Sequence, residues 1–291
     1  IQAGGGDDRA QPAGGERGLR TCVAAADGPD PGLDLTALRA VRGRRLDPTA
    51  VLAQIVDYRD HHDSMWVAWS GGKDSTVVVD LARRVDPEVP VVFYDCGLDF
   101  PETRTYIADL ADAWNLNVHV VRTEPDLLTV LVAAGDFDPT AAAWRLEVNM
   151  REAMITAPAQ RAHAVFGPAN LWGVRAAESA GRRHLYRTQA ARHDGAIPRG
   201  MVRRGDGTTS FGPIWNWSTE QVWTYAAARD IPPNPLYAKL EALGADAHTA
   251  RVNAMIDPSR LDNGHITRLA AGWPDIYHRL VEVLPRLAEY R

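Results

Sequence analysis

One segment constrains the fold of this 291-residue chain more than any other: an apolar run, a glycine turn and a helical pattern in direct succession. Residues 65–69 predict a buried strand, and residues 76–84 predict a helix. The turn between them consists of Ser70, Gly71, Gly72, Lys73, Asp74 and Ser75. Glycines allow a ligand to approach the backbone closely, and free N–H groups at a helix start attract anions. The order therefore predicts a phosphate-binding loop, to which Lys73 adds a compact positive charge and two serines add hydroxyl donors.

The loop does not match the G-x-x-x-x-G-K-[ST] motif of kinases and GTPases, because only two glycines precede Lys73. The pattern S-G-G-x-D-S instead resembles the pyrophosphate loop of the ATP pyrophosphatases. This resemblance implies an enzyme that holds the β- and γ-phosphates of ATP, attacks the α-phosphorus with an acceptor and releases pyrophosphate. The alternative is a glycine turn that only joins a strand to a helix.

Lysine usage points to the same loop. The chain has 32 lysines and arginines together, but only Lys73 and Lys239 are lysines. Because the chain uses arginine almost everywhere, a lysine is expected at a position where the ligand needs a compact point charge and not a planar guanidinium. Lys239 is therefore expected near the same ligand.

Strands and helices alternate after the loop. Residues 90–95 and 118–122 predict strands, whereas residues 102–115 and 126–134 predict helices. This alternation predicts an α/β fold with an open, mostly parallel twisted sheet and helices on both faces. The resemblance implies the same arrangement, which is adenine nucleotide alpha hydrolase-like.

The chain is expected to have four parts: a loosely ordered arm (1–32), a helical segment (33–64), the ATP pyrophosphatase domain (65–240, with a basic insert at 176–211) and a helical tail (241–291). Within the domain, residues 164–175 predict a further strand that ends in a glycine turn. The insert is expected to be a long mobile loop. Ser218 and Gln221 have the spacing of a capping box, and the proline-rich residues 231–237 are expected not to be helical.

Residues 94–103 resemble the D-T-G-x-x-F-P-E-T segment of the phosphoadenylyl-sulfate (PAPS) reductase family, with Cys96 in place of the usual threonine. Asp95 ends a predicted strand, and ligands of open α/β sheets bind beyond such strand ends. Asp74 and Asp95 would together give two carboxylates beside a triphosphate, a set that suits Mg²⁺. The alternative is that Asp95 only caps a helix.

A second segment resembles the G-x-R-x-x-E-S-x-x-R pattern of the same family through Gly173, Arg175, Glu178, Arg182 and Arg183. The resemblance implies nucleotide-binding roles for the glycine and the glutamate. Arginines here would grip phosphate or stabilise charge on the α-phosphate. Between positions 175 and 204 the sequence contains eight arginines and only two acidic residues. This excess of positive charge favours an anionic partner: ATP, a phosphosulfate or a nucleic-acid backbone. The alternative is a solvated basic loop.

Two further matches follow in the family's order. Residues 211–225 match P-I-x-x-W-x-x-x-x-V-W-x-Y, and residues 234–237 match an N-P-L-Y turn. The resemblance thus covers residues 65–240, and the aromatic residues in these matches are expected to be structural.

Cys22 and Cys96 are the only cysteines, so neither a disulfide framework, a four-cysteine zinc site nor an iron–sulfur cluster is expected. The reductases of the family carry a nucleophilic cysteine in a C-terminal E-C-G-x-H segment, and residues 97–291 contain no cysteine. Cys96 is therefore not expected to act as a thiol reductant. Alternatively it carries sulfur, its pKa lowered by arginines and a helix N-terminus.

These features predict an ATP pyrophosphatase that adenylates an acceptor oxygen and primes it for replacement by sulfur. The cysteine-poor ATP pyrophosphatases of DNA phosphorothioation systems are the most similar type. The resemblance implies ATP, Mg²⁺, DNA with partner proteins and a cysteine desulfurase as ligands and partners, and it leaves a homodimer open. The alternatives are a sulfate adenylyltransferase small subunit or PAPS reductase-like enzyme, a tRNA-thiolating enzyme, and a non-catalytic ATP-sensing subunit.

Charge and hydropathy restrict the setting. The net charge of −5 excludes a wholly basic surface but allows a local basic face. No apolar run approaches the ~20 residues needed to cross a bilayer, and the N-terminal residues lack the order of a secretory signal. We therefore expect no membrane contact and a cytoplasmic location.

Overall fold

A computed structural model describes residues 47–135, 149, 151–192, 198–246, 250–257, 261 and 264–291. The predicted arm at 1–32 and the first part of the helical segment at 33–64 lie outside the described residues. All described residues belong to one compact unit.

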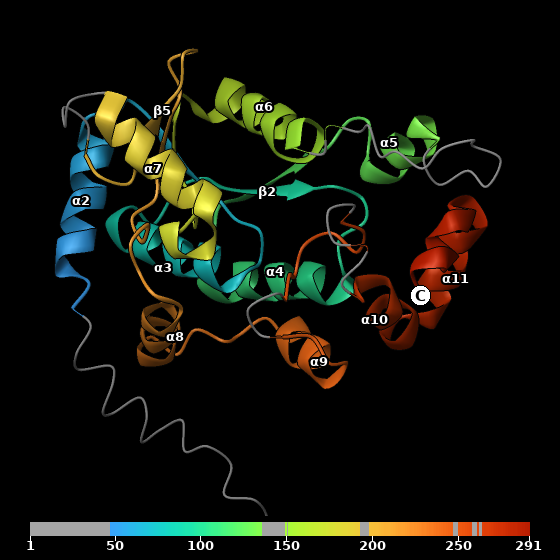
Figure 1. Cartoon of the computed structure of the whole chain (residues 1–291). Helices are drawn as coiled ribbons and strands as arrows, with labels where there is room; N and C mark the ends of the chain where they lie inside the picture. Colours follow the sequence, from blue (N-terminus) through green and yellow to red (C-terminus); the bar gives the residue numbers. More distant parts are fainter. Residues whose placement is uncertain are drawn as a thin grey trace, which may run out of the picture. The chain divides into compact units, whose positions relative to one another are not determined.

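A six-stranded sheet forms the centre of this unit (Figure 1). Its strands are β1 (Met65–Ala68), β2 (Val91–Asp95), β3 (Val118–Arg122), β4 (Ala169–Leu171), β5 (Met201–Arg203) and β6 (Thr209–Phe211). They lie in the order β3-β2-β1-β4-β6-β5, and every pairing is parallel except that of β5 with β6. The predicted open, mostly parallel α/β sheet is confirmed.

Helices alternate with these strands. They are α2 (Thr49–Asp60), α3 (Lys73–Val85), α4 (Pro101–Trp114), α5 (Leu127–Ala134), the π-helix η2 (Glu152–Thr156), α6 (Ala157–Phe166), the 3₁₀ turn η3 (Ala176–Glu178), α7 (Ala180–Arg192) and α8 (Thr219–Ala228). Ser218 and Gln221 form the predicted capping box at the start of α8.

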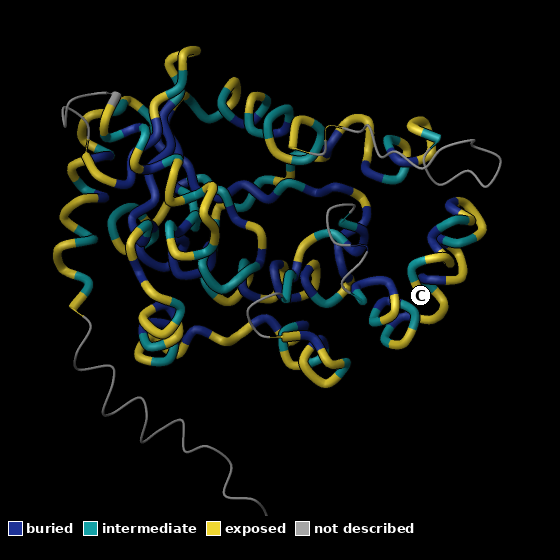
Figure 2. The backbone as a smooth tube through the Cα atoms, viewed as in Figure 1, coloured by how far each residue is buried: buried dark blue, intermediate teal, exposed yellow. Residues whose placement is uncertain are grey.

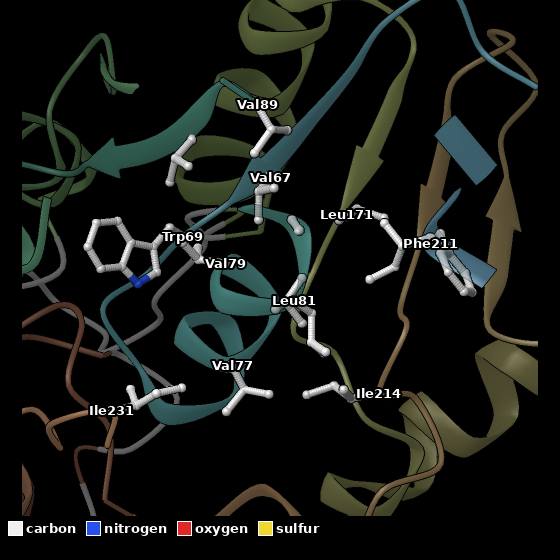
Figure 3. Close-up of a cluster of buried hydrophobic side chains, with 14 of the residues drawn as sticks. Val67, Trp69, Val77, Val79, Leu81, Val89, Leu171, Phe211, Ile214 and Ile231 are labelled. Atoms are coloured by element: carbon white, nitrogen blue, oxygen red, sulfur yellow. The ribbon is translucent and has the colours of Figure 1, made fainter. Parts of the chain in front are cut away.

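Both faces of the sheet are covered, because successive side chains of a strand point to opposite faces. Trp66 and Val92 pack with Ala162 of α6 on one face. Val67 and Val91 belong to the cluster of α3 on the other face. Figure 3 shows part of this cluster, in which Val67, Leu171 and Phe211 of three strands gather with Val77, Val79 and Leu81 of α3. The strands β1, β2, β4 and β6 are largely buried, whereas β3 and α2 are mostly exposed or intermediate (Figure 2).

A second apolar cluster joins the C-terminal helices to the segment after β2. These helices are α9 (Leu236–Ala242), α10 (His265–Gly272), α11 (Pro274–Val283) and the 3₁₀ helix η5 (Pro285–Tyr290). Leu98 and Phe100 pack in this cluster with Leu236, Ile266 and Leu287. The described residues of the tail form α10, α11 and η5, and their packing brings them to the carboxyl end of β2.

Three local expectations are wrong. Residues 164–166 end α6, and the strand begins only at Ala169. The segment 176–211 is not a loop along its described length: it forms η3, α7, β5 and β6, because β6 pairs with β4 inside the sheet. Leu236 and Tyr237 are helical, since the first turn of a helix tolerates the preceding Pro235.

Candidate functional site

The phosphate-binding loop predicted from the sequence lies between β1 and α3, at the carboxyl end of the sheet's central strands. Its two serines hold its shape. The Ser75 hydroxyl accepts from the Ser70 amide at 3.2 Å, donates to the Gly72 carbonyl at 3.0 Å and shares a 3.1 Å hydrogen bond with the Ser70 hydroxyl. The helix begins at Lys73, so the first amides of α3 lie within the loop.

Two glycines permit close packing around the loop. Gly71 has a φ of +69°, and a Cβ there would lie 2.8 Å from Thr103 Cγ2 of α4. Gly173 follows β4, and a Cβ there would lie 2.5 Å from the Ser75 amide nitrogen. Gly173 therefore lets the segment after β4 contact the start of α3.

A compact ion cluster lies at the start of α3. Asp74 accepts from Lys73 Nζ at 2.9 Å and from Arg175 Nε at 2.6 Å. Arg175 is only 2% exposed, and its other two nitrogens donate to the Trp217 carbonyl at 3.0 Å and the Thr219 hydroxyl at 3.2 Å. Arg175 therefore holds three segments together, and Lys73 is the more accessible cation of the cluster.

Glu178 forms the other acidic centre. It accepts from the Arg175 amide at 2.9 Å, pairs with Arg182 of α7 and lies 3.7 Å from Arg251. Burial alone would raise the pKa of Glu178, but the Arg175 amide and the charge of Arg182 outweigh it and lower this pKa. Arg183 is exposed on α7. The basic segment thus presents Arg182 and Arg183 on a helix.

Asp95 ends β2 and Cys96 follows it, but the surroundings of Cys96 differ from those of the sulfur-carrier alternative. Asp95 accepts from the Gly97 amide at 2.9 Å and pairs with Arg104 at 3.1 Å. Cys96 is buried, and its pKa is raised first by burial and then by the charge of Asp99. The lowered pKa that the sulfur-carrier alternative requires is not found, because the carboxylates of Asp99 and Asp95 lie near the thiol.

A pocket of about 410 Å³ opens at the carboxyl ends of β2 and β3. Arg104, Arg122 and Thr123 line it together with Asp95, Gly97, Glu124 and Asp126. The Thr123 hydroxyl is buried and has no hydrogen-bond partner among the described residues. A ligand with hydroxyl or amine groups would satisfy it.

The contacts of Lys239 lie outside the loop of residues 70–75. Its ammonium pairs with Glu102 at 2.7 Å and lies 3.9 Å from the centre of the Trp273 ring, which also donates to Glu102. It therefore links α9 to α4 and the C-terminal helices. A cation–π partner and a carboxylate account for this lysine without a ligand.

Sequence reasoning missed three residues around the loop. The Asn234 amide donates to the Gly71 carbonyl at 3.1 Å, and the Tyr237 hydroxyl accepts from the Lys73 amide at 3.2 Å. The N-P-L-Y match includes these two residues, but it predicted only a turn and no contact with the loop. Arg251, one of six arginines in the tail, carried no sequence signal.

The described residues contain no group of three or more histidines, cysteines and acidic residues arranged to hold a metal. Asp74 and Asp95 still suit a magnesium ion that also takes phosphate oxygens and water, which needs only one or two carboxylates. Asp74 already pairs with Lys73 and Arg175, and Asp95 pairs with Arg104, so a magnesium ion would compete with these cations for both carboxylates.

Comparison with known proteins assigns the family. The model of the phosphoadenosine phosphosulfate reductase domain matches residues 64–250. The chain belongs to this family. Among its relatives, an adenosine 5'-phosphosulfate reductase of Geobacillus kaustophilus is 27% identical over 213 residues, which cover 71% of this chain and 80% of the relative. A sulfate adenylyltransferase subunit 2 of Allorhizobium ampelinum is 30% identical over 192 residues, 60% of this chain and 58% of the relative.

A solved structure of this family is also similar. The PAPS reductase of Candida auris aligns with a TM-score of 0.48 and 21% identity, covering 73% of this chain and 91% of that protein. No helix in the described part of this family member is long and apolar enough to span a membrane.

Proposed function

We propose that this chain cleaves ATP to AMP and pyrophosphate, with adenylation of an acceptor oxygen as the productive step. The relatives named above act on adenine nucleotides in sulfur chemistry, which supports a nucleotide enzyme of sulfur metabolism. The observation that carries the finer proposal is the glycine loop at the start of α3 with Lys73 beside it, because amides at a helix N-terminus and a lysine bind phosphate. Residues 97–291 contain no cysteine that could act as a reductase nucleophile.

In this proposal an anionic oxygen of the acceptor attacks the α-phosphorus, and the bond from that phosphorus to the bridging oxygen breaks. Pyrophosphate leaves with the electron pair. The loop amides and Lys73 bind the leaving pyrophosphate, and Arg175 keeps Asp74 in position. Magnesium, held by Asp74 and Asp95, would neutralise phosphate charge. The pocket beyond β2 and β3 has the size and polar lining to take the nucleoside.

Product analysis tests the reaction. Purified protein with ATP, Mg²⁺ and candidate acceptors is expected to release AMP and pyrophosphate, and excess EDTA is expected to stop the release. ADP and orthophosphate as main products would contradict the proposal. Full activity in EDTA would show that the reaction does not need magnesium.

We propose the DNA backbone as the acceptor, because Arg182 of α7 pairs with Glu178, three residues after the Arg175 that pairs with Asp74 at the loop. Duplex DNA affinity is expected to fall steeply with salt, since bound phosphates release counterions. Replacing Arg182 and Arg183 with alanine is expected to weaken binding to all sequences and to reduce the salt slope by about two. Arg279→Ala on the exposed face of α11 is the control.

The measurement is a binding titration at two or more salt concentrations, with and without partner proteins. Binding that does not respond to salt would exclude DNA. Sulfate would then be the favoured acceptor, because a sulfate adenylyltransferase subunit is among the relatives. ATP cleavage stimulated by tRNA would favour a thiolating enzyme, and ATP binding without cleavage would favour a sensing subunit.

Cys96 is expected to be dispensable for ATP cleavage. In a Cys22→Ser background, Cys96 should resist iodoacetamide at pH 8 in the folded protein, because burial raises the pKa of its thiol. Cys96→Ser should keep the rate of AMP release. Rapid alkylation, or full ATP cleavage with loss of sulfur incorporation, would instead make Cys96 a sulfur carrier.

A further inference from the structure

Tyr237 lies where the N-P-L-Y turn contacts the phosphate loop. Asn234 fixes the turn by donating to the Gly71 carbonyl at 3.1 Å and to the Thr103 hydroxyl at 3.0 Å. The Tyr237 ring packs edge-on against Trp223, with 5.8 Å between ring centres. These contacts hold the phenol against the loop, and two of the partners, Thr103 and Trp223, belong to helices outside the loop. The position of the phenol therefore does not depend on the loop alone.

The hydroxyl of Tyr237 takes up one of the backbone amides at the start of α3 that could otherwise bind an anion. It accepts from the amide of Lys73, the first residue of α3, at 3.2 Å. The same oxygen lies 3.5 Å from where a Cβ on Gly72 would be, so it borders the loop backbone directly. Lys73 Nζ is 6.0 Å from the centre of the Tyr237 ring.

This hydroxyl has a proton to give. Among the residues that the structure describes, it accepts the hydrogen bond from Lys73 and donates none. Burial raises the pKa of Tyr237 to about 12, so the phenol is neutral near pH 7 and keeps its proton. A neutral O–H beside a phosphate loop can donate to a phosphate oxygen without electrostatic repulsion.

We propose that Tyr237 is a phosphate-binding residue, whose hydroxyl donates to an oxygen of the pyrophosphate moiety held by the loop. This inference rests on the proposed function. A phosphate oxygen is charged and accepts the Lys73 amide more strongly than a phenol does. When it takes that amide, the Tyr237 oxygen no longer needs to accept, and its proton points to the same anion. The N-P-L-Y turn thereby adds a phosphate ligand to the loop at residues 70–75.

Calorimetric titration with inorganic pyrophosphate tests the inference without requiring catalysis. Tyr237→Phe removes one oxygen and keeps the ring beside Trp223. A lost hydrogen bond to a charged group is expected to weaken pyrophosphate binding about tenfold or more. Tyr277→Phe, in the same apolar cluster on α11, is the matched control and should bind as the unmodified protein does. Unchanged melting temperatures would show that both variants fold.

The outcomes separate the inference from the proposed function. If the unmodified protein does not bind pyrophosphate, the proposed function is wrong. If it binds and Tyr237→Phe binds equally well, Tyr237 is not a phosphate ligand. Tighter binding by Tyr237→Phe would also overturn the inference, because it would show that the hydroxyl only competes for the Lys73 amide.

Discussion

Replacing Lys73 with alanine is expected to slow ATP cleavage about a hundred- to a thousand-fold, a loss of ~3–4 kcal/mol of transition-state stabilisation. Among the described residues, Lys73 Nζ pairs with Asp74 at 2.9 Å from the end of a flexible stem, so it can turn towards the β- and γ-phosphates. The rate of AMP release under saturating ATP measures the effect. Pyrophosphate affinity, measured separately, shows how much of the loss is binding.

Lys239→Ala is the matched control, because it removes the only other lysine of the chain. Its ammonium pairs with Glu102 at 2.7 Å and lies on the Trp273 ring, so its loss should affect stability slightly and leave the rate of AMP release unchanged. An unchanged rate in Lys73→Ala would show that the loop is structural. Equal losses in both variants would point to folding and not to catalysis.

Replacing Arg175 with methionine is expected to lower the free energy of unfolding by about 3–5 kcal/mol, because it breaks a buried ion pair. The guanidinium is 2% exposed and bonds Asp74, the Trp217 carbonyl and the Thr219 hydroxyl. Methionine fills similar volume but leaves these acceptors without their donor. Arg175→Lys should recover little, because an ammonium cannot reach three fixed acceptors as a planar fork does.

Denaturant unfolding followed by circular dichroism measures this effect. Arg187→Met, an exposed position on α7, is the control and should stay within ~0.5 kcal/mol of the unmodified protein. If Arg175→Met is as stable as the control, the buried guanidinium does not hold the loop. A stable Arg175→Met that has lost ATP cleavage would instead make Arg175 a direct phosphate ligand.

The agreement between sequence and structure is best around the loop. The predicted strands at 65–69, 90–95 and 118–122 differ from β1, β2 and β3 by at most one residue at an end. These strands are buried or flanked by turn residues, so hydropathy marks them clearly. The helix after the loop begins three residues earlier than predicted, because Lys73, Asp74 and Ser75 form its first turn.

Prediction failed between residues 176 and 211 for a physical reason. Along α7 only Tyr186 and Gln189 are buried, so the helix shows almost no apolar period. The strands β5 and β6 are three residues long, too short for an alternating pattern to stand out. This segment becomes part of the sheet because β6 pairs with β4, which lies forty positions earlier in the sequence.

The sequence by itself determined the parts whose signals are local: the glycine loop, the strands and helices that flank it, the capping box of α8 and the family's motif order. Tertiary structure alone decided which charges meet. Asp74 finds Arg175 101 positions away, Lys73 finds Tyr237 at 164, and Lys239 finds Glu102 at 137. Such partners depend on how the strand ends and the C-terminal helices pack together. Residue types record which groups can pair, whereas packing sets the distances at which they do.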